Sequence, residues 1–159
     1  STMGATTLAA ESGALSCDHL EYSDETDVAA MAMHGTIAVL LPAAFYFLRE
    51  TRKPPIELLR KHKVPMAVAT DLNPGSAPVA SLLAAMHMAG ILFGMTPSEI
   101  LLGVTLHAAG ALGRSGKTGG LAPGHHADFS VWDLPAPEFL TYQLGGLKPT
   151  ALFFKGKRT

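Results

Sequence analysis

Two short polar clusters each follow an apolar run, and both contain side chains that can carry acid–base or metal chemistry. The first is Asp18-His19-Leu20-Glu21, and the second is Asp71-Leu72-Asn73-Pro74-Gly75-Ser76. In parallel α/β proteins, functional groups lie at the carboxyl ends of strands and in the loops that follow them. Two such clusters on neighbouring strands favour a functional site. We therefore expect His19 and Asp71 to lie at the same end of one parallel sheet.

Each of the two residues also has a purely structural interpretation. Asp71 could cap the next helix or hold the turn through its side chain. His19 could be hydrogen-bonded into the core, as is common near the end of a buried strand. Alternatively, the carboxylates of Asp18 and Glu21 could fix the tautomer of His19 and raise its basicity, as carboxylates do behind catalytic histidines. The sequence leaves these interpretations open.

The remaining histidines carry weaker signals. His34 and His62 fall near predicted helix ends, where a histidine interacts favourably with the helix C-terminus. His87 and His107 fall inside predicted helices, and the adjacent pair His125-His126 would point in different directions on an extended chain. The sequence has no His-x-His, Cys-x-x-Cys or Gly-x-Ser-x-Gly motif and no glycine-rich phosphate loop. Candidate chemistry is therefore confined to the two clusters.

Three predicted strands must position these clusters. The strands are predicted at Ala14–Leu20, Thr36–Leu41 and Met66–Thr70. The second of these lacks polar alternation, which is typical of parallel strands covered by helices on both faces. Helical patterns lie between the runs. Alternation of strand and helix at this spacing is the signature of βαβ units, so the fold class is predicted as α/β.

The expected helices have recognisable starts and ends. Ser23 can cap the first helix, and Gly35 can end it in the left-handed conformation. Pro54 and Pro55 open the second helix, while Pro42 stops the strand before it. Thr96-Pro97-Ser98-Glu99 is a capping box that opens a further helix.

The composition changes after residue 112, so we expect two units. Residues 1–112 carry the strand–helix alternation. Residues 113–159 are rich in glycine and contain two short predicted strands, Asp128–Trp132 and Thr150–Lys155. This second unit is interpreted as a small β element attached to the α/β part.

The bulk properties exclude several partners. The chain has 159 residues, of which 48% are hydrophobic and 16% charged, with a net charge of −1, so it can form a core. Only the short tail Lys155–Arg158 is basic, so no nucleic acid is expected. The most apolar run, Val79–Met95, is shorter than the ~20 apolar residues of a membrane-spanning helix, so no membrane is expected.

A single cysteine, Cys17, rules out an internal disulfide framework and fits a reducing compartment. The residues after Ser1 show no signal peptide. We therefore expect a cytoplasmic protein whose sequence begins after processing or within a longer chain.

On these residues the chain resembles the imidazolonepropionase family of the amidohydrolase superfamily. Ala14–Tyr22 resembles the sixth barrel strand of that family, Ala38–Tyr46 the seventh, and Ala69–Ser76 the eighth, which is the most specific match. Gly119–Asp128 resembles the segment that returns the chain to a small β domain. The resemblance implies the C-terminal portion of a (β/α)8 TIM-type barrel, about strands 6 to 8, plus part of a small β-sandwich domain.

The resemblance also implies an activity. The family hydrolyses imidazolone-5-propanoate to N-formimidoyl-L-glutamate in histidine degradation, using one Zn²⁺ or Fe³⁺ ion. Carried over, Asp71 is the metal ligand and proton shuttle, and His19 is the histidine beside the metal. Contacts to this small-molecule substrate or its product are implied for Asn73, Gly75 and Ser76. The backbone N–H groups of that turn could bind the substrate's carboxylate.

Some features of the family are missing from this sequence. It lacks the His-x-His pair of the first strand, and the fifth-strand histidine would precede Ser1. A catalytic metal needs at least three protein ligands, and a full barrel takes ~250 residues. We therefore expect the chain to be inactive alone and to be part of a longer enzyme, which the resemblance to the family implies is a homodimer. Two alternatives remain: a related cyclic amidohydrolase or deaminase, and a non-catalytic α/β module that binds a partner through its exposed barrel edge.

Overall fold

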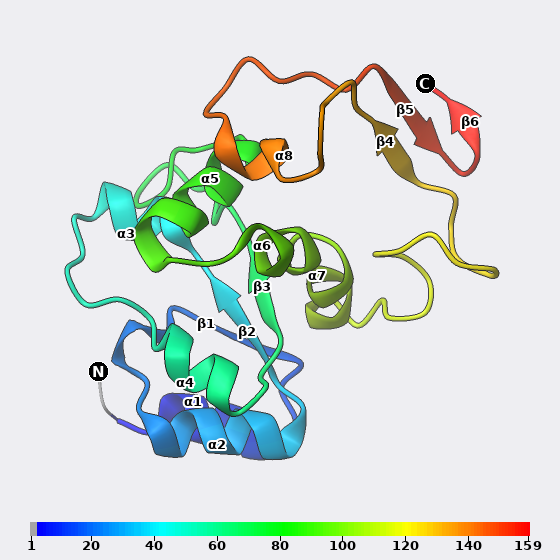
Figure 1. Ribbon diagram of the computed structural model, residues 1–159. Coiled ribbons are helices and arrows are strands. Elements are labelled where there is room, and N and C mark those ends of the chain that lie inside the picture. The colour runs from blue at the N-terminus through cyan, green and yellow to red at the C-terminus, as the bar shows by residue number, and fades with distance from the viewer. Residues whose placement is uncertain (1–2) are drawn as a thin grey trace.

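The computed structural model describes residues 3–159, which form a mixed α/β structure with two separate sheets (Figure 1). The first part contains α1 (Ala5–Glu11), β1 (Ser16–Asp18), the 3-10 helix η1 (Leu20–Tyr22), α2 (Glu25–His34), β2 (Ile37–Leu40), α3 (Pro42–Phe47), α4 (Ile56–Lys61), β3 (Met66–Val68), α5 (Leu82–Phe93), α6 (Pro97–Gly103) and α7 (Leu106–Ala111). The second part contains β4 (Phe129–Val131), α8 (Phe139–Tyr142), β5 (Ala151–Phe154) and β6 (Lys157–Arg158).

The first sheet is parallel throughout, with the strand order β1-β2-β3. Its register pairs Cys17 with Ala38 and Val39 with Ala67. Helices α6 and α7 pack on β3, which is buried along its whole length. The three predicted parallel strands are confirmed, but each is shorter than predicted. Strand β1 ends at Asp18 because His19 adopts a left-handed backbone, with φ 54°, and leads into η1.

Helix α2 is capped by Asp24, so the prediction of Ser23 as the cap is wrong by one residue. The side chain of Asp24 accepts hydrogen bonds from the backbone N–H groups of Thr26 and Asp27, and Asp27 completes a capping box. Ser23 instead places its Oγ 2.9 Å from Oγ1 of Thr6 in α1. The predicted end of this helix at Gly35, in the left-handed conformation, is confirmed.

Three short helices were not predicted. Strand β2 ends before Pro42, as predicted, and Pro42 then occupies the first turn of α3, where a helix makes no hydrogen bond to the backbone nitrogen. Helix α1 packs on α2, and Thr7 donates to Oδ1 of Asp27 from its N–H at 3.1 Å and from its hydroxyl at 2.6 Å. Helix α8 has four residues, too few for a periodic pattern. The capping box predicted at Thr96 and Glu99 is confirmed.

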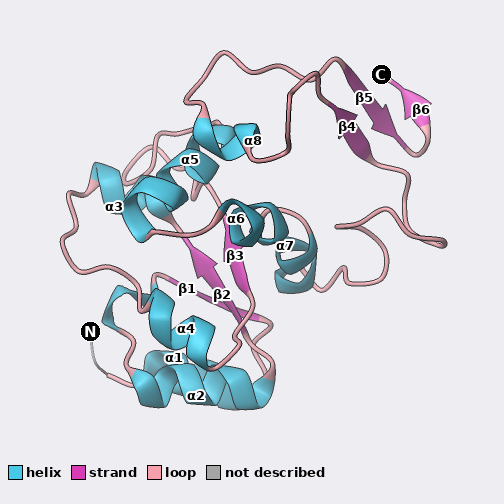
Figure 2. Ribbon diagram, viewed as in Figure 1, coloured by secondary structure: helices cyan, strands magenta, loops and turns pink. Residues whose placement is uncertain are grey.

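The hydrophobic core lies between the first sheet and its helices. Figure 2 shows α1, α2 and α4 grouped together on one side of that sheet. Its most completely buried large apolar side chains are Leu20, Val28, Met31, Leu40, Leu59 and Ile100. A second, smaller cluster consists of Leu41, Ala43, Ala44 and Ala77. We call it the turn-anchoring cluster, because Ala77 ends the turn that follows β3.

The second sheet is antiparallel, in the order β4-β5-β6, and lies apart from the first sheet at the C-terminal end (Figure 1). Phe129 of β4 stacks on Phe153 of β5 with ring centroids 4.5 Å apart. The carboxylate of Asp128 accepts a hydrogen bond from the N–H of Lys155 at 2.7 Å, which fixes the start of β4 against the end of β5. Across residues 3–159, no helix has the length and apolar character needed to cross a bilayer.

Candidate functional site

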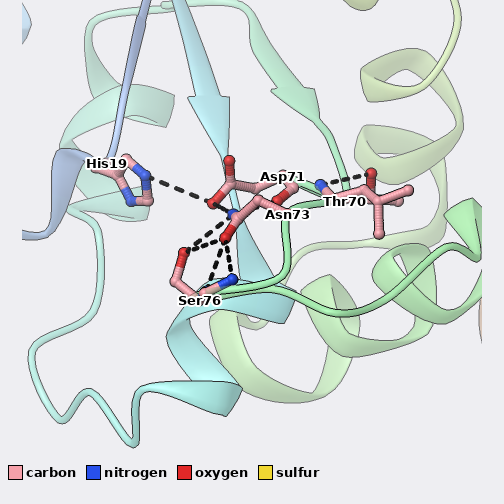
Figure 3. Close-up of polar contacts among 7 residues, drawn as sticks. His19, Thr70, Asp71, Asn73 and Ser76 are labelled. Carbon is pink, nitrogen blue, oxygen red and sulfur yellow. Dashed lines mark hydrogen bonds and ion pairs between the residues drawn. The ribbon is translucent and has the colours of Figure 1, made fainter.

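His19 and Asp71 meet at the carboxyl end of the parallel sheet. His19 directly follows β1, and Asp71 comes shortly after β3. The Nε2 atom of His19 lies 3.8 Å from Oδ2 of Asp71, and Figure 3 shows the two side chains pointing toward each other. The expected convergence of these residues is therefore confirmed, whereas their catalytic roles remain predictions.

Both residues hold an unusual backbone conformation. His19 has φ 54° and Asp71 has φ 52°, in the left-handed region that residues other than glycine seldom adopt. Such conformations cost about 1–3 kcal/mol each and persist only where surrounding contacts hold them. For His19 the neighbouring anchor is Leu20, which is 1% exposed in the main core. For Asp71 the anchor is the turn that follows it.

The side chain of Asn73 organises that turn. Its Oδ1 accepts hydrogen bonds from the N–H of Gly75 at 2.9 Å and from the N–H of Ser76 at 2.7 Å. Its Nδ2 donates to the backbone oxygen of Asp71 at 2.7 Å and lies 3.3 Å from the Asp71 carboxylate. Asparagine commonly closes a turn in this way, through its own side chain. Figure 3 shows this group of contacts between Asn73 and Ser76 beside Asp71.

The backbone N–H groups of this turn are not free, contrary to what we expected from the sequence. Those of Gly75 and Ser76 donate to Asn73, and that of Asn73 donates to the backbone oxygen of Ala77 at 3.1 Å. Pro74 has no N–H. The turn therefore satisfies its own donors, so they do not form the anion site expected. Contact of Asn73, Gly75 and Ser76 with a substrate remains a prediction.

The turn is fixed at both ends. Ala77 is fully buried in the turn-anchoring cluster, against the start of α3. At the other end, Oγ1 of Thr70 accepts a hydrogen bond from the N–H of Leu72 at 3.3 Å. Ser81 caps the next helix, α5, by accepting from the N–H of Ala84 at 3.2 Å. Asp71 therefore does not cap α5, and that structural alternative is wrong.

The carboxylate that faces His19 is that of Asp71. In the described part of the chain, no hydrogen bond joins His19 to Asp18 or to Glu21, which the sequence had suggested as its partners. The side chain of Glu21 is instead 8% exposed within η1.

The other histidines occupy structural positions. The Nδ1 atom of His107 lies 3.0 Å from the backbone oxygen of Met66, at the start of β3. That of His87 lies 2.9 Å from the backbone oxygen of Tyr142, which joins α5 to α8. His62 pairs with Glu25 at 3.2 Å. Each of these three histidines therefore joins two elements of the fold, and none of them lies with His19 and Asp71.

The chemistry available at the site is that of one carboxylate and one imidazole. The side chains of Asp71 and His19 are 28% and 52% exposed, so a ligand can reach both. Carboxylate oxygen and imidazole nitrogen are ligands of zinc and of non-haem iron. Within residues 3–159, no group of three histidine, cysteine, aspartate or glutamate side chains could hold a metal ion. The described residues could therefore supply some, but not all, of the ligands of a metal ion.

Comparison with known proteins agrees with this fold. The sequence profile of the amidohydrolase family matches residues 4–159. The chain is 58% identical over 154 residues to the imidazolonepropionase of Hahella chejuensis, covering 97% of this chain and 38% of that protein. It is 56% identical over 157 residues to the imidazolonepropionase of Erwinia tasmaniensis, covering 99% of this chain and 39% of that protein. The chain thus spans well under half the length of these relatives.

Two solved structures share the fold at low sequence identity. An adenosine deaminase from Xanthomonas campestris with bound zinc superposes with a TM-score of 0.80 at 22% identity, over 90% of this chain and 36% of that one. The guanine deaminase of E. coli superposes with a TM-score of 0.75 at 17% identity, over 91% of this chain and 38% of that one. At these identities the likeness concerns the fold.

Proposed function

The chain belongs to the amidohydrolase family, and on that premise we propose that it forms part of the active site of a longer hydrolase that opens a cyclic amide. The proposed reaction converts imidazolone-5-propanoate to N-formimidoyl-L-glutamate, a step in histidine degradation. The observation that carries the proposal is the pair of His19 and Asp71, 3.8 Å apart at the carboxyl end of the sheet. Identities of 52–60% to imidazolonepropionases support the choice of substrate.

We place the chain as the C-terminal part of the barrel. Strands β1, β2 and β3 would be the sixth, seventh and eighth strands, residues 1–112 the barrel part, and residues 113–159 strands of the accessory β-sandwich. In residues 3–159, β1 and β3 each pair only with β2, so each leaves one edge for a further parallel strand. Those strands would come from the remaining length that the relatives have and this chain does not.

Asp71 is proposed as a ligand of one Zn²⁺ or iron ion, with the remaining ligands outside this chain. When bound, such an ion lowers the pKa of water toward ~7, so that hydroxide is available at neutral pH. A carboxylate suits either ion, and its side chain is accessible. The zinc bound by a deaminase of the same fold supports a metal at this place.

The two side chains have distinct proposed roles in moving protons and charge. The Asp71 carboxylate accepts a proton from the attacking water and returns it to the ring nitrogen as the amide C–N bond breaks. The water oxygen is retained on the former carbonyl carbon. His19 donates a hydrogen bond through Nε2 to the oxygen on which negative charge develops. Their separation of 3.8 Å lets one small substrate contact both groups.

The substrate is proposed to approach the turn that follows Asp71. Gly75 is exposed and Ser76 is half-buried. Asn73 is also proposed to contact the substrate or product, because the resemblance to the family implies it. The full-length enzyme is proposed to be a homodimer on the same ground.

The proposal is tested by assaying the full-length polypeptide that contains this chain, with imidazolone-5-propanoate as substrate. We expect N-formimidoyl-L-glutamate as the product, and no turnover by the isolated 159 residues. Ammonia released from purines or other cyclic amidines, without opening of imidazolone-5-propanoate, would instead support the deaminase alternative and contradict the proposal.

A further inference from the structure

We propose that Asp27 is a positioning residue for His19, because its carboxylate ties the start of α2 to the start of α1 and so holds the loop that carries the imidazole. This inference rests on the proposed role of His19 at the site. Residues 19–24 connect β1 to α2, so His19 begins this loop and Asp24, the N-cap of α2, ends it. The position of the imidazole therefore depends on how firmly the far end of the loop is held.

The carboxylate of Asp27 serves two helices at once. Its Oδ2 accepts a hydrogen bond from the N–H of Asp24 at 3.2 Å, which completes the capping box of α2. Its Oδ1 accepts from the N–H of Thr7 at 3.1 Å and from the hydroxyl of Thr7 at 2.6 Å. Helix α1 has Gly4 at its N-cap and therefore no side-chain cap of its own. Asp27 supplies that cap from the neighbouring helix.

Burial makes this link between the two helices hard to loosen. Asp27 is 6% exposed, and within residues 3–159 no ion pair with a lysine, arginine or histidine reaches it. Its negative charge is stabilised by the three hydrogen bonds and by the amino ends of α1 and α2. If the helices moved apart, the carboxylate would lose donors while still shielded from water, which is costly for a buried charge.

A second polar contact joins the same loop to α1. Ser23, the residue before the cap, is buried, and its Oγ lies 2.9 Å from Oγ1 of Thr6. At the other end of the loop, Leu20 is buried in the main core. The ring of His19 is half-exposed and its backbone is left-handed, with φ 54°. Its orientation therefore depends on both anchors of the loop, of which the one at α1 is closed by Asp27.

The deciding experiment is a double-mutant cycle in the full-length metal-loaded enzyme, with imidazolone-5-propanoate as substrate. Asp27→Ala removes all three hydrogen bonds and leaves His19 and Asp71 in place. We expect kcat to fall by about 10-fold, within the roughly 10²-fold that a displacement of about 1 Å can cost. In a His19→Asn background the same substitution should change kcat little, because the side chain that it positions is gone. KM and metal retention should stay near those of the wild type.

Thr7→Val gives a second, milder test that keeps the Asp27 carboxylate. Valine retains the shape of threonine and the backbone N–H but lacks the hydroxyl that donates at 2.6 Å. We expect a smaller fall in kcat, again absent from the His19→Asn background, whereas Thr7→Ser keeps the hydroxyl and should keep kcat. Thr96→Ala is the matched control, because it breaks the capping box of α6, a helix packed on β3. It should lower the thermal midpoint of unfolding and leave kcat unchanged.

Two results would overturn the inference. One is normal kcat in both Asp27→Ala and Thr7→Val, which would mean that the contacts serve only the packing of the helices. The other is a fall in kcat by the same factor in the wild-type and His19→Asn backgrounds, which would mean that Asp27 acts through general stability. His19→Asn alone separates this inference from the proposed function. If it keeps normal turnover, the proposed role of His19 fails; if it loses turnover while Asp27→Ala does not, only the positioning role fails.

Discussion

The imidazole of His19 and the carboxylate of Asp71 face each other at 3.8 Å, although they follow the two outer strands of a three-stranded parallel sheet. Both reach this position through left-handed backbone conformations at the points where their strands have ended. The contact between these two side chains therefore links the carboxyl ends of β1 and β3 across the end of β2 (Figure 3). This pairing is the feature from which the proposed chemistry follows.

His19→Asn tests the imidazole half of the pair. Asparagine tolerates the left-handed backbone, so the fold should be kept. Its amide is shorter and cannot reach the position of Nε2, so kcat of the full-length enzyme should fall by roughly 10²-fold, as when a donor to a developing oxyanion is lost. Steady-state kinetics with imidazolone-5-propanoate provides the measurement.

A matched control for that substitution is His62→Asn. His62 also pairs with a carboxylate, Glu25 at 3.2 Å, but at the surface end of α4. Its replacement should leave kcat unchanged. A His19→Asn variant as active as the control would show that His19 has no part in the reaction.

Glu99 links stability to pH. Arg60 donates to both of its carboxylate oxygens at 2.7 Å, and this holds the pKa of Glu99 at about 2, below the ordinary 4.5. A lowered folded pKa stabilises the protein above the unfolded value, and the contribution is lost as pH falls. Glu99→Gln should therefore lower the thermal midpoint of unfolding at neutral pH. The difference in midpoint between this variant and the wild type should shrink as pH falls below about 4.5 and should vanish near pH 2.

Glu57→Gln is the control for this prediction. Glu57 contacts the same Arg60, but its side chain is 83% exposed, and surface ion pairs contribute little. Its replacement should barely change the midpoint at any pH. A Glu99→Gln midpoint difference that persists undiminished at pH 2 would contradict the assigned cause.

Gly119 lets residues 113–128 approach α7 closely. A Cβ atom at this position would lie 2.7 Å from Cβ of Ala109 and 2.8 Å from the backbone oxygen of Thr105. Gly124 has the same φ of 86° but nothing within 4 Å of its Cβ position. Gly119→Ala should therefore destabilise by about 1–3 kcal/mol more than Gly124→Ala, the usual cost of overpacking. Urea unfolding of the two variants gives the comparison, and equal losses would show that the close contact is absent in solution.

The parts of the fold that followed from the sequence are those with a local physical signal. Parallel order was predictable because predicted strands alternate with helical patterns along the chain and the run Thr36–Leu41 has no polar alternation. The capping box at Thr96 was predictable because side chains and backbone three residues apart satisfy each other. The cap of α2 was misplaced by one residue because serine and aspartate are equally good caps. In the structure the hydroxyl of Ser23 contacts Thr6, and Asp24 caps the helix.

The candidate site was predictable in its residues but not in its geometry. His19 and Asp71 could be chosen from the sequence because each follows a predicted strand of a parallel sheet. Their separation depends on two left-handed residues that no local pattern requires. Likewise, the sequence suggested free N–H groups around Pro74, because it does not show that the Asn73 side chain folds back onto them.

The central claim, that Asp71 is both metal ligand and proton carrier, is tested most directly by Asp71→Asn in the full-length enzyme. Asparagine tolerates the left-handed backbone and keeps one oxygen, but it has no negative charge and cannot accept the proton. Turnover of imidazolone-5-propanoate should fall by roughly 10²-fold or more, the scale of losing a positioned general base, while thermal stability is kept. Near-normal turnover at full metal occupancy would contradict the assignment and remove Asp71 from the mechanism.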